Sequence, residues 1–528
     1  MKSYQFSRRE SNCFSNQQLL LTDNQNELQD FIGLTFSEEN LIKQTQVKSK
    51  FFTSEKRELL VSVLTKNYEN VSNNELTLKN ISILKNNNSF TIATGHQLNL
   101  MTGPLYFIYK ILHVIKQCDI LNKKYPENQF VPVYWMASED HDFEEIKSFL
   151  LFGKTISWES EQGGAVGRMG VFGLSAVFDQ VQQFFSNHTE SEIHQLIEKL
   201  SGNTYGEVFF KFIHELFGDF GLVIVDGDKK EFKEAFKPIF KQELTTSFSY
   251  NTVTLSNEKL AAKNFKIQVK PREINLFFLG ENKRDRIISL DKGFQIGTDF
   301  YSNNELLELL DTSIASFSPN VVLRPLYQEF ILPNICYVGG VGELGYWLQL
   351  RSTFESAAIP YPLIQARTSA IWLEKNIQDK LKQLDFKIEA IFKSTAELKK
   401  DYLLNNEEET INFNLQDFQF EQFKNEFFQK SEIIDSSIKS WMEAEFTRME
   451  KQVDGIKNRL EKSVKSKHDK ALKSIDLIKE KLFPTNGMQE RSFNFFQFCY
   501  DGNYKENLRN IYDELKPFDT DILILIED

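Results

Sequence analysis

Apolar and polar residues alternate in three distinct patterns over residues 90–146. Residues 90–94 form a short apolar run with β-branched side chains, which predicts a buried strand. Over residues 104–121 apolar residues recur at every third or fourth position, which predicts a helix with Thr102 as its N-cap. Residues 131–137 form a second apolar run of strand length. The order strand, glycine-bearing loop, helix and strand predicts a βαβ unit of a parallel sheet.

A polar cluster follows each of these two strands. Residues 94–97 read Thr-Gly-His-Gln, and residues 138–142 read Ser-Glu-Asp-His-Asp. Ligands of parallel sheets bind beyond the carboxyl ends of the strands, often against helix N-termini. If the two strands are neighbours in the sheet, both clusters face one crevice, and we expect a ligand site there.

Both clusters contain candidate catalytic residues. His96 and Gln97 are suited to donate hydrogen bonds to a phosphate or a developing anion, although a histidine here could simply satisfy backbone groups at a strand end. In the second cluster a carboxylate could hold Mg²⁺ beside a nucleotide or accept a proton from an attacking amine. The alternative is a set of acids stabilised in the first turn of a helix. Because four successive residues cannot all face one way, we select Asp140 and His141, with His96, as the catalytic candidates.

Three later segments add candidates for binding. Residues 320–333 predict a strand that becomes a short helix, residues 334–347 a strand, a glycine-rich turn and a helix, and residues 360–367 a short strand ending in an arginine. Arginines there are suited to bind substrate carboxylates, and glycines before a helix to approach an anion; surface ion pairs and a plain tight turn are the alternatives. No residue is assigned as a metal ligand. The candidates for binding substrate or nucleotide are Thr94, Gly95, Gln97, Gly103, Ser138, Arg324, Gly339, Gly340, Glu343 and Arg367.

A long apolar seam marks the C-terminal third of the chain. Over residues 433–482 apolar residues recur at threes and fours, which predicts a helix of about fifty residues, roughly 75 Å long. A second long helix near residues 371–398 is expected to pack against it as an antiparallel hairpin or coiled coil. A rod of this length buries little against a globular core, so we expect a second copy of the chain as its partner. Residues 521–526 predict a last strand.

Composition narrows the classes of function. The chain has 528 residues, 41% of them hydrophobic, and a formal net charge of −12 with no basic face, which argues against a nucleic-acid-binding protein. The four cysteines lie far apart, which argues against a zinc ribbon or a disulfide scaffold and favours a reducing compartment. We find neither the apolar core of a signal peptide nor an apolar run of membrane-spanning length. We therefore expect a cytoplasmic protein that does not contact membranes.

The motifs described above carry a family resemblance. The segment TGHQLNLMTGPLYFIYK (94–110), followed by PVYWMASEDHDFEEI (132–146), resembles the bacillithiol-biosynthesis cysteine-adding enzyme family, the cysteine ligases. Matching segments recur at residues 323–325, at residues 337–340 with Glu343, and at residues 484–498, so the resemblance covers most of the chain. It implies an α/β fold with a Rossmann-like parallel-sheet core, connecting-peptide insertions, and a C-terminal antiparallel helical coiled coil that forms a homodimer.

The predicted elements and the family resemblance together divide the chain into three parts. We expect the Rossmann-like core over residues 1–375, interrupted by mostly helical insertions near residues 150–218 and 240–275. A helical coiled-coil domain would follow over residues 376–484. Residues 485–528 would form a tail that packs back on the core.

The resemblance also implies a reaction, the addition of cysteine to glucosaminyl-malate in the last step of bacillithiol synthesis. Joining an amine to a carboxylate requires an activated carboxylate, and ATP, with Mg²⁺ as a candidate companion, is the expected activator. Asp140 or His141 would take the amine proton, while Arg324 or Arg367 would hold a carboxylate of malate or cysteine. Two alternatives remain: another ATP-dependent ligase or nucleotidyltransferase using the same crevice, and a non-enzymatic coiled-coil scaffold.

Overall fold

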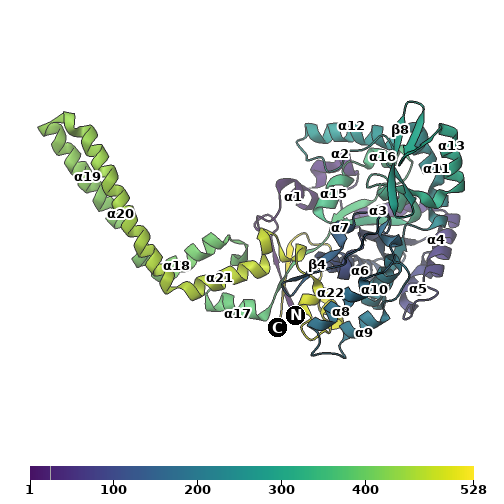
Figure 1. Cartoon of the computed structure of the whole chain (residues 1–528), viewed down its shortest axis with the longest axis horizontal. Coiled ribbons are helices and arrows are strands. Elements are labelled where there is room, and N and C mark those ends of the chain that lie inside the picture. The colour runs from purple at the N-terminus through teal and green to yellow at the C-terminus, as the bar shows by residue number, and fades with distance from the viewer. Residues whose placement is uncertain (24) are drawn as a thin grey trace. The chain divides into compact units, whose positions relative to one another are not determined.

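The computed structural model describes residues 1–23 and 25–528 (Figure 1). The chain divides into two compact units. The first comprises residues 1–371, 489–526 and 528, and the second comprises residues 372–488 and 527. Over the described residues, no helix combines the length and the apolar character needed to cross a membrane.

A five-stranded parallel sheet forms the centre of the first unit, with strand order β13-β12-β2-β3-β6. Its strands are β2 (Ser89–His96), β3 (Gln129–Met136), β6 (Val223–Asp226), β12 (Asn334–Gly339) and β13 (Leu363–Ala366). Strands β2 and β3 are neighbours in a register that pairs His96 with Met136, so their carboxyl ends lie together. The predicted α/β class and the two predicted strands are confirmed.

Successive residues of these strands alternate between two buried faces. Ile92 packs in one apolar cluster with Val114 of α6 (Tyr106–Lys124), whereas Ala93 packs in another with Phe236 of α11 (Lys230–Thr246). Helices therefore cover both faces of the sheet, as a parallel sheet requires. The other helices before the sheet or between its later strands are α1 (Asn16–Asp23), α2 (Gln29–Ile32), α3 (Glu38–Phe51), α4 (Ser54–Asn67), α5 (Glu75–Ile83), α13 (Asn303–Thr312), α14 (Arg324–Ile331), α15 (Val341–Trp347) and α16 (Arg351–Ser356).

The loop between β2 and α6 differs from its prediction. Thr102 is not the N-cap of α6; it ends a 3-10 turn with a φ of 69°, and Gly103 follows with a φ of 60°. The helix begins at Tyr106, and the residue before it, Leu105, donates its N–H to the carbonyl oxygen of Phe493 at 2.7 Å. A main-chain contact from the distant tail therefore takes the place of a local side-chain cap.

Two insertions interrupt the sheet. The first contains the hairpin β4 (Ser148–Leu151) and β5 (Lys154–Ser157), a short helix α7 (Phe143–Ile146) before it, and the helices α8 (Leu174–Phe184), α9 (Glu192–Lys199) and α10 (Tyr205–Phe217). The second contains α12 (Phe248–Ala262) and an antiparallel sheet of order β10-β9-β8-β7-β11. The strands of that sheet are β7 (Leu276–Gly280), β8 (Lys283–Leu290), β9 (Gly293–Ile296), β10 (Asp299–Tyr301) and β11 (Phe317–Pro319). The sequence pattern did not predict this second sheet.

The two ends of the chain meet in the first unit. Strand β1 (Lys2–Phe6) pairs antiparallel with β15 (Ile522–Ile526), with Lys2 opposite Ile526. The predicted last strand is confirmed. Between residue 489 and β15 the chain forms α22 (Lys505–Glu514).

The second unit is helical. Helices α19 (Asn414–Ile434) and α20 (Lys439–Lys467) lie side by side (Figure 1) and run antiparallel, because Lys424 pairs with Glu450 and Lys457 with Asp417. The predicted coiled coil is present, but the predicted partner helix near residues 371–398 is wrong. That stretch instead holds the end of β14 (Ser369–Leu373), α17 (Lys375–Gln383), a 3-10 turn (Ile388–Phe392) and the start of α18 (Thr395–Ile411). The predicted single helix over residues 433–482 is also divided, into α20 and α21 (Asp469–Leu482).

Candidate functional site

A cavity of about 670 Å³ lies at the carboxyl ends of β2 and β3. Gln97, which follows β2, donates from Nε2 to Oδ2 of Asp140 at 2.8 Å and to Oε2 of Glu145 at 2.9 Å. This amide links the two polar clusters, so the structure brings them into one crevice as expected. The predicted site residues that line the cavity are Gly95, His96, Gln97, Ser138, Asp140, His141, Arg324 and Glu343.

The His96 imidazole is neutral in this cavity. Its Nδ1 lies 3.2 Å from the carbonyl oxygen of Gln97, which can only accept, so Nδ1 carries the proton. Nε2 then accepts from the hydroxyl of Tyr106 at 3.1 Å. Burial, with the nearby Lys110 ammonium, lowers the pKa of His96 to about 4. Because both ring nitrogens are engaged, His96 is arranged for hydrogen bonding rather than for proton exchange near neutral pH.

Asp140 is held as a carboxylate. Burial raises its pKa, but hydrogen bonds from His141 and Gln97 and the charge of Arg284 outweigh burial and hold the pKa of Asp140 well below its usual range. The backbone N–H of His141 donates to Oδ1 of Asp140 at 2.7 Å. The His141 ring is half exposed, and its Nδ1 accepts from Nη1 of Arg284 at 3.0 Å. Asp140 therefore supplies a fixed negative charge, and His141 an accessible ring beside it.

Glu343, in the first turn of α15, is a second fixed carboxylate. The Lys110 ammonium contacts both of its oxygens, and the hydroxyl of Tyr337 donates to Oε2 at 2.8 Å. Burial raises the pKa of Glu343, but the Lys110 charge and these hydrogen bonds outweigh burial and lower it. The carboxylate stays ionised inside the cavity.

Arg324, at the start of α14, brings a cation to the same place. It donates from Nη1 to Oε1 of Gln328 at 3.0 Å, and its guanidinium carbon lies 5.8 Å from the centre of the Tyr337 ring. A Cβ atom on Gly95 would lie 3.4 Å from Nη1 of Arg324 and 3.4 Å from the carbonyl oxygen of Trp135. The Arg324 guanidinium therefore lies against the end of β2, in contact range of Gly95.

Ser138 lines the cavity but is already bonded within the protein. Its hydroxyl donates to Oδ1 of Asp226, the last residue of β6. The neighbouring Glu139 pairs with the buried Lys233 at 2.8 Å, and burial raises the pKa of Glu139. The first contact ties the residues after β3 to the end of β6, and the second ties them to α11.

Four predicted site residues in loops or strands lie outside the cavity lining. The Thr94 hydroxyl is buried and donates to the carbonyl oxygen of Val338 at 2.7 Å, which joins β2 to β12. Gly103 serves the turn before α6, because a Cβ there would meet Nδ2 of Asn99 at 2.6 Å. Gly339 accepts from the N–H of Arg367 through its carbonyl oxygen at 2.8 Å, and Gly340 precedes α15 in an extended conformation. These four residues therefore shape the strands and turns next to the cavity rather than its lining.

Arg367 also lies outside the cavity lining, in a buried ion pair. It donates from Nη1 and Nη2 to the two carboxylate oxygens of Glu490, each at 2.9 Å. Glu490 also accepts from the N–H of Ala370 at 3.0 Å. The guanidinium carbon of Arg367 lies 4.7 Å from the centre of the Tyr106 ring. The ion pair therefore packs against the tyrosine whose hydroxyl bonds to His96.

A basic wall of the cavity was missed by the sequence prediction. Its residues are Lys270, Arg272, Arg284 and Arg286. The Arg284 side chain is only 8% exposed, lies 3.7 Å from the Asp140 carboxylate, and has its Nε without a hydrogen-bond partner among the described residues. The only sequence signal was the charged run of β8, KRDRIISL, which fits a solvated surface equally well. The wall gives the cavity positive charge to set against the strand-end acids.

Comparisons with known proteins match nearly the whole chain. Residues 2–368 match the model of the bacillithiol biosynthesis BshC N-terminal Rossmann-like domain, and residues 370–527 match that of the BshC C-terminal coiled-coil domain. A Flavobacterium psychrophilum protein named "Putative cysteine ligase BshC" is 37% identical over 522 residues, 97% of each chain. A protein of the same name from Flavobacterium johnsoniae is 38% identical over 92% of each chain. Another, from Christiangramia forsetii, is 37% identical over 98% of this chain and 97% of the relative. The chain therefore belongs to the BshC family of bacillithiol biosynthesis, with its Rossmann-like and coiled-coil domains.

Proposed function

We propose that the protein is a cytoplasmic ligase that joins the carboxylate of L-cysteine to the amine of glucosaminyl-malate, the last step of bacillithiol synthesis. The observation that carries this proposal is the meeting of strand-end acids with a basic wall in one cavity. An amine substrate and carboxylate-bearing partners need charges of both signs close together. The relatives that bear the name cysteine ligase support the same reaction.

In this proposal the basic wall binds the carboxylates. Glucosaminyl-malate keeps the two carboxylates of its malyl group through the reaction, and arginine pairs with such groups through parallel hydrogen bonds. Of the two arginines predicted for this role, Arg324 lines the cavity, whereas Arg367 is occupied by Glu490. Arg284, which also lines the cavity, is the second cation that we assign to the malyl carboxylates.

The proton of the attacking amine is assigned to the Asp140–His141 pair. With its pKa held well below the usual range, Asp140 is a weak base and acts as a charge that stabilises the cationic nitrogen. Histidine is the side chain that most often exchanges protons in catalysis, but Nδ1 of His141 accepts from Arg284. A substrate carboxylate that draws Arg284 away would free Nδ1 to take the proton. Binding of the malyl group would in this way prepare the base.

ATP is the proposed activator; when bound, it supplies the leaving group that makes the cysteine carboxylate reactive. The donors suited to its phosphates are Lys270, Arg272 and Arg286 of the basic wall, all in the cavity lining. Among the described residues, no group of three or more His, Cys, Asp and Glu side chains is arranged to hold a metal ion. Mg²⁺ commonly uses only one or two carboxylates together with phosphates, and Asp140 and Glu145 are the proposed pair.

We also propose that the protein acts as a homodimer through α19 and α20. Large apolar side chains on this hairpin remain exposed, such as Trp441 at 63% and Ile456 at 62%. Met449, Ile456 and Leu460 follow one another at spacings of seven and four, which places them on one side of α20. A second copy of the hairpin would bury this apolar side.

The reaction is tested by incubating the purified protein with cysteine, glucosaminyl-malate and ATP, and by detecting the thiol product by mass spectrometry. We expect the product only when all three small molecules are present. Formation of product without ATP would remove the activation step from the proposal but keep the ligase. Absence of product, together with turnover of another amine or nucleotide substrate, would favour a different ligase or nucleotidyltransferase, and absence of any turnover would favour a scaffold.

A further inference from the structure

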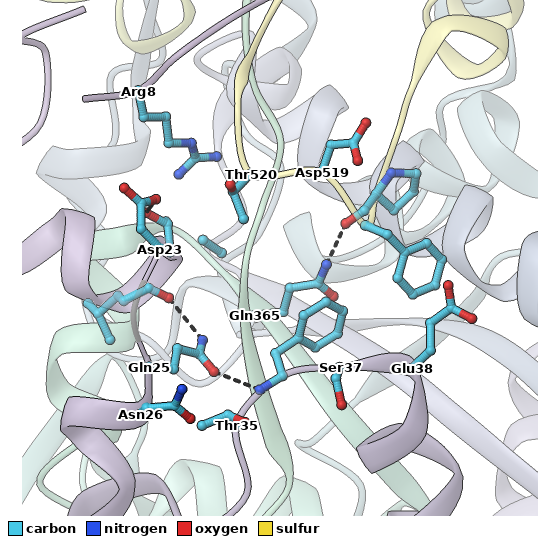
Figure 2. A pocket seen from close by; sticks show the side chains of 16 residues that line it. Arg8, Asp23, Gln25, Asn26, Thr35, Ser37, Glu38, Gln365, Asp519 and Thr520 are labelled. Atoms are coloured by element: carbon cyan, nitrogen blue, oxygen red, sulfur yellow. Dashed lines mark hydrogen bonds between the residues drawn. The ribbon is translucent and has the colours of Figure 1, made fainter. Parts of the chain in front are cut away.

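A second cavity of about 380 Å³ lies elsewhere in the first unit (Figure 2). It is formed by the end of α1 with residues 25 and 26, by residues 35–38, by the end of β13 and by residues 517–520. It shares no lining residue with the cavity at the ends of β2 and β3. Nothing in the proposed ligase reaction uses it.

Arg8 points into this cavity with part of its hydrogen-bonding capacity unused (Figure 2). The residue is only 3% exposed, and its Nη2 donates to the carbonyl oxygen of Arg367 at 2.9 Å. Among the residues that the structure describes, Nε and Nη1 of Arg8 have no hydrogen-bond partner. Burial lowers the pKa of Arg8 to about 10, so the side chain remains a cation at neutral pH. A buried cation with two unpartnered nitrogens is costly unless an acceptor reaches it.

The acids around the cavity are already paired. Asp23 contacts Arg9 at 3.4 Å and accepts from the hydroxyl of Thr22 at 2.6 Å. Asp519 accepts from the amide of Gln5 at 2.7 Å. Glu38 pairs with the Lys124 ammonium, which lies outside the lining. The charges of Glu490, Asp23 and Asp521 act on Arg8, but no acceptor bonds to its Nε and Nη1 among the described residues. These two donors are the unused polar groups of the cavity, and an oxyanion would supply their acceptors.

The walls of the cavity are fixed before any ligand arrives. Gln25 donates to the carbonyl oxygens of Leu21 and Ile364 at 2.9 and 3.2 Å and accepts from the N–H of Phe36 at 2.7 Å, and Figure 2 shows this amide within the wall. Gln365 donates to the carbonyl oxygen of Pro517 at 2.5 Å. The rings of Phe36 and Phe518 stack with their centres 6.1 Å apart. Such prior ordering lowers the entropy that binding would otherwise cost.

We propose that this second cavity is a binding site for a small hydroxylated oxyanion, whose carboxylate or phosphate group pairs with Nε and Nη1 of Arg8. Thr35, Asn26 and Thr520 line the same cavity, and their polar side chains suit the hydroxyl groups of such a ligand. The carboxylates of Asp23 and Asp519 accept from those hydroxyls. The volume admits a compact metabolite.

The site is tested by calorimetric titration of the full chain with inorganic phosphate and, separately, with L-malate at constant ionic strength. The two ligands distinguish a phosphate from a carboxylate as the anionic group. Arg8→Gln is compared with Lys79→Gln, which removes the same charge from an exposed position of α5 outside the cavity lining. Anion binding in the other cavity is common to both variants and cancels in the comparison.

We expect Arg8→Gln to lose one binding event or to weaken it by at least about tenfold, and Lys79→Gln to stay within roughly twofold of the unchanged protein. Thr520→Leu, a change at an exposed residue beside Arg8 in Figure 2, should weaken the same event without affecting folding. If Arg8→Gln does not fold, the binding measured for Thr520→Leu still tests the proposal. Equal binding by all variants, or no binding of either probe to the unchanged protein, would overturn the proposal.

Discussion

Lys110 donates from Nζ to both carboxylate oxygens of Glu343, at 2.6 and 2.8 Å, although 233 residues separate the two in the chain. The same ammonium donates to the carbonyl oxygen of Gly95 at 2.6 Å. One buried cation therefore joins the end of β2 to the first turn of α15. This ion pair gathers two distant loops around the candidate site and keeps a carboxylate ionised within it.

Removing one partner of this pair should destabilise the protein more than removing both. Lys110→Met leaves the half-buried Glu343 carboxylate without its cation, which should lower the free energy of unfolding by roughly 1–3 kcal/mol. Adding Glu343→Gln should restore a large part of that loss, because a neutral amide needs no counter-charge. Urea unfolding of the single and double variants measures both effects. A double variant no more stable than Lys110→Met would show that the pair does not carry the predicted coupling.

Two arginines predicted for substrate binding should respond differently to the same change. Arg324→Lys should raise KM for glucosaminyl-malate by about tenfold, since Arg324 lines the cavity and lysine cannot form paired hydrogen bonds to a carboxylate. Arg367→Lys should instead lower the free energy of unfolding, because its two bonds to Glu490 are buried. Steady-state kinetics and urea unfolding of both variants separate the roles. A larger effect of Arg367→Lys on KM than on stability would place Arg367 at the substrate.

Stability should fall as the pH drops below 6.5, in part because of a buried histidine. Burial lowers the pKa of His113 to about 3 and Thr368 donates its N–H to Nδ1, so the folded protein keeps this ring neutral while the unfolded chain binds a proton below pH 6.5. The unfolded state therefore gains protons first, and stability is lost as the pH falls. Between pH 6.5 and 4 the loss from this ring is about 3 kcal/mol.

The pH effect is measured as the difference in unfolding free energy between the unchanged protein and His113→Gln across that range. The difference should shrink steadily towards pH 4. The exposed His188, changed to Gln, serves as the control and should leave the pH dependence as it was. A difference that stays constant with pH would contradict the assignment.

The apolar side of α20 should control the oligomeric state. Ile456→Glu combined with Leu460→Glu places two charges where a second hairpin is expected to pack, and should convert a dimer to a monomer. Light scattering measures the mass directly. Lys462→Glu changes a charge on the opposite side of the helix and should leave the dimer intact. A monomeric unchanged protein would remove the proposed dimer.

The βαβ unit was predictable because local signals agree there. Each strand of the unit is an apolar run bounded by polar residues, and the intervening helix repeats its apolar residues at helical spacing. Parallel neighbours then place the ends of both strands together, which the link from Gln97 to Asp140 demonstrates. The predicted crevice followed from topology alone, without any knowledge of distant residues.

The sequence-based predictions failed where contacts between residues far apart in the chain determine the structure. The strand that carries Arg284 is highly charged and has no clear alternation of apolar residues, so nothing local marks it as part of a sheet. The partner of Arg367 is Glu490, 123 residues further along, and no spacing rule connects them. In the coiled coil the partner of α20 is α19, whose phenylalanines pack around Phe446, rather than a helix near residues 371–398. An apolar seam identifies a helix that needs a partner but does not identify that partner.

We propose that the polar groups gathered at the ends of β2 and β3 carry out the ligation, and the kinetics of Asp140→Asn are its sharpest test. Asp142 offers a matched control, since it lies outside the cavity lining and caps α7 through its side chain, a role that asparagine fills equally well. We predict that Asp140→Asn lowers kcat/KM for thiol product by roughly 100-fold or more, whereas Asp142→Asn stays near the unchanged protein. Equal activity of the two variants would contradict the account.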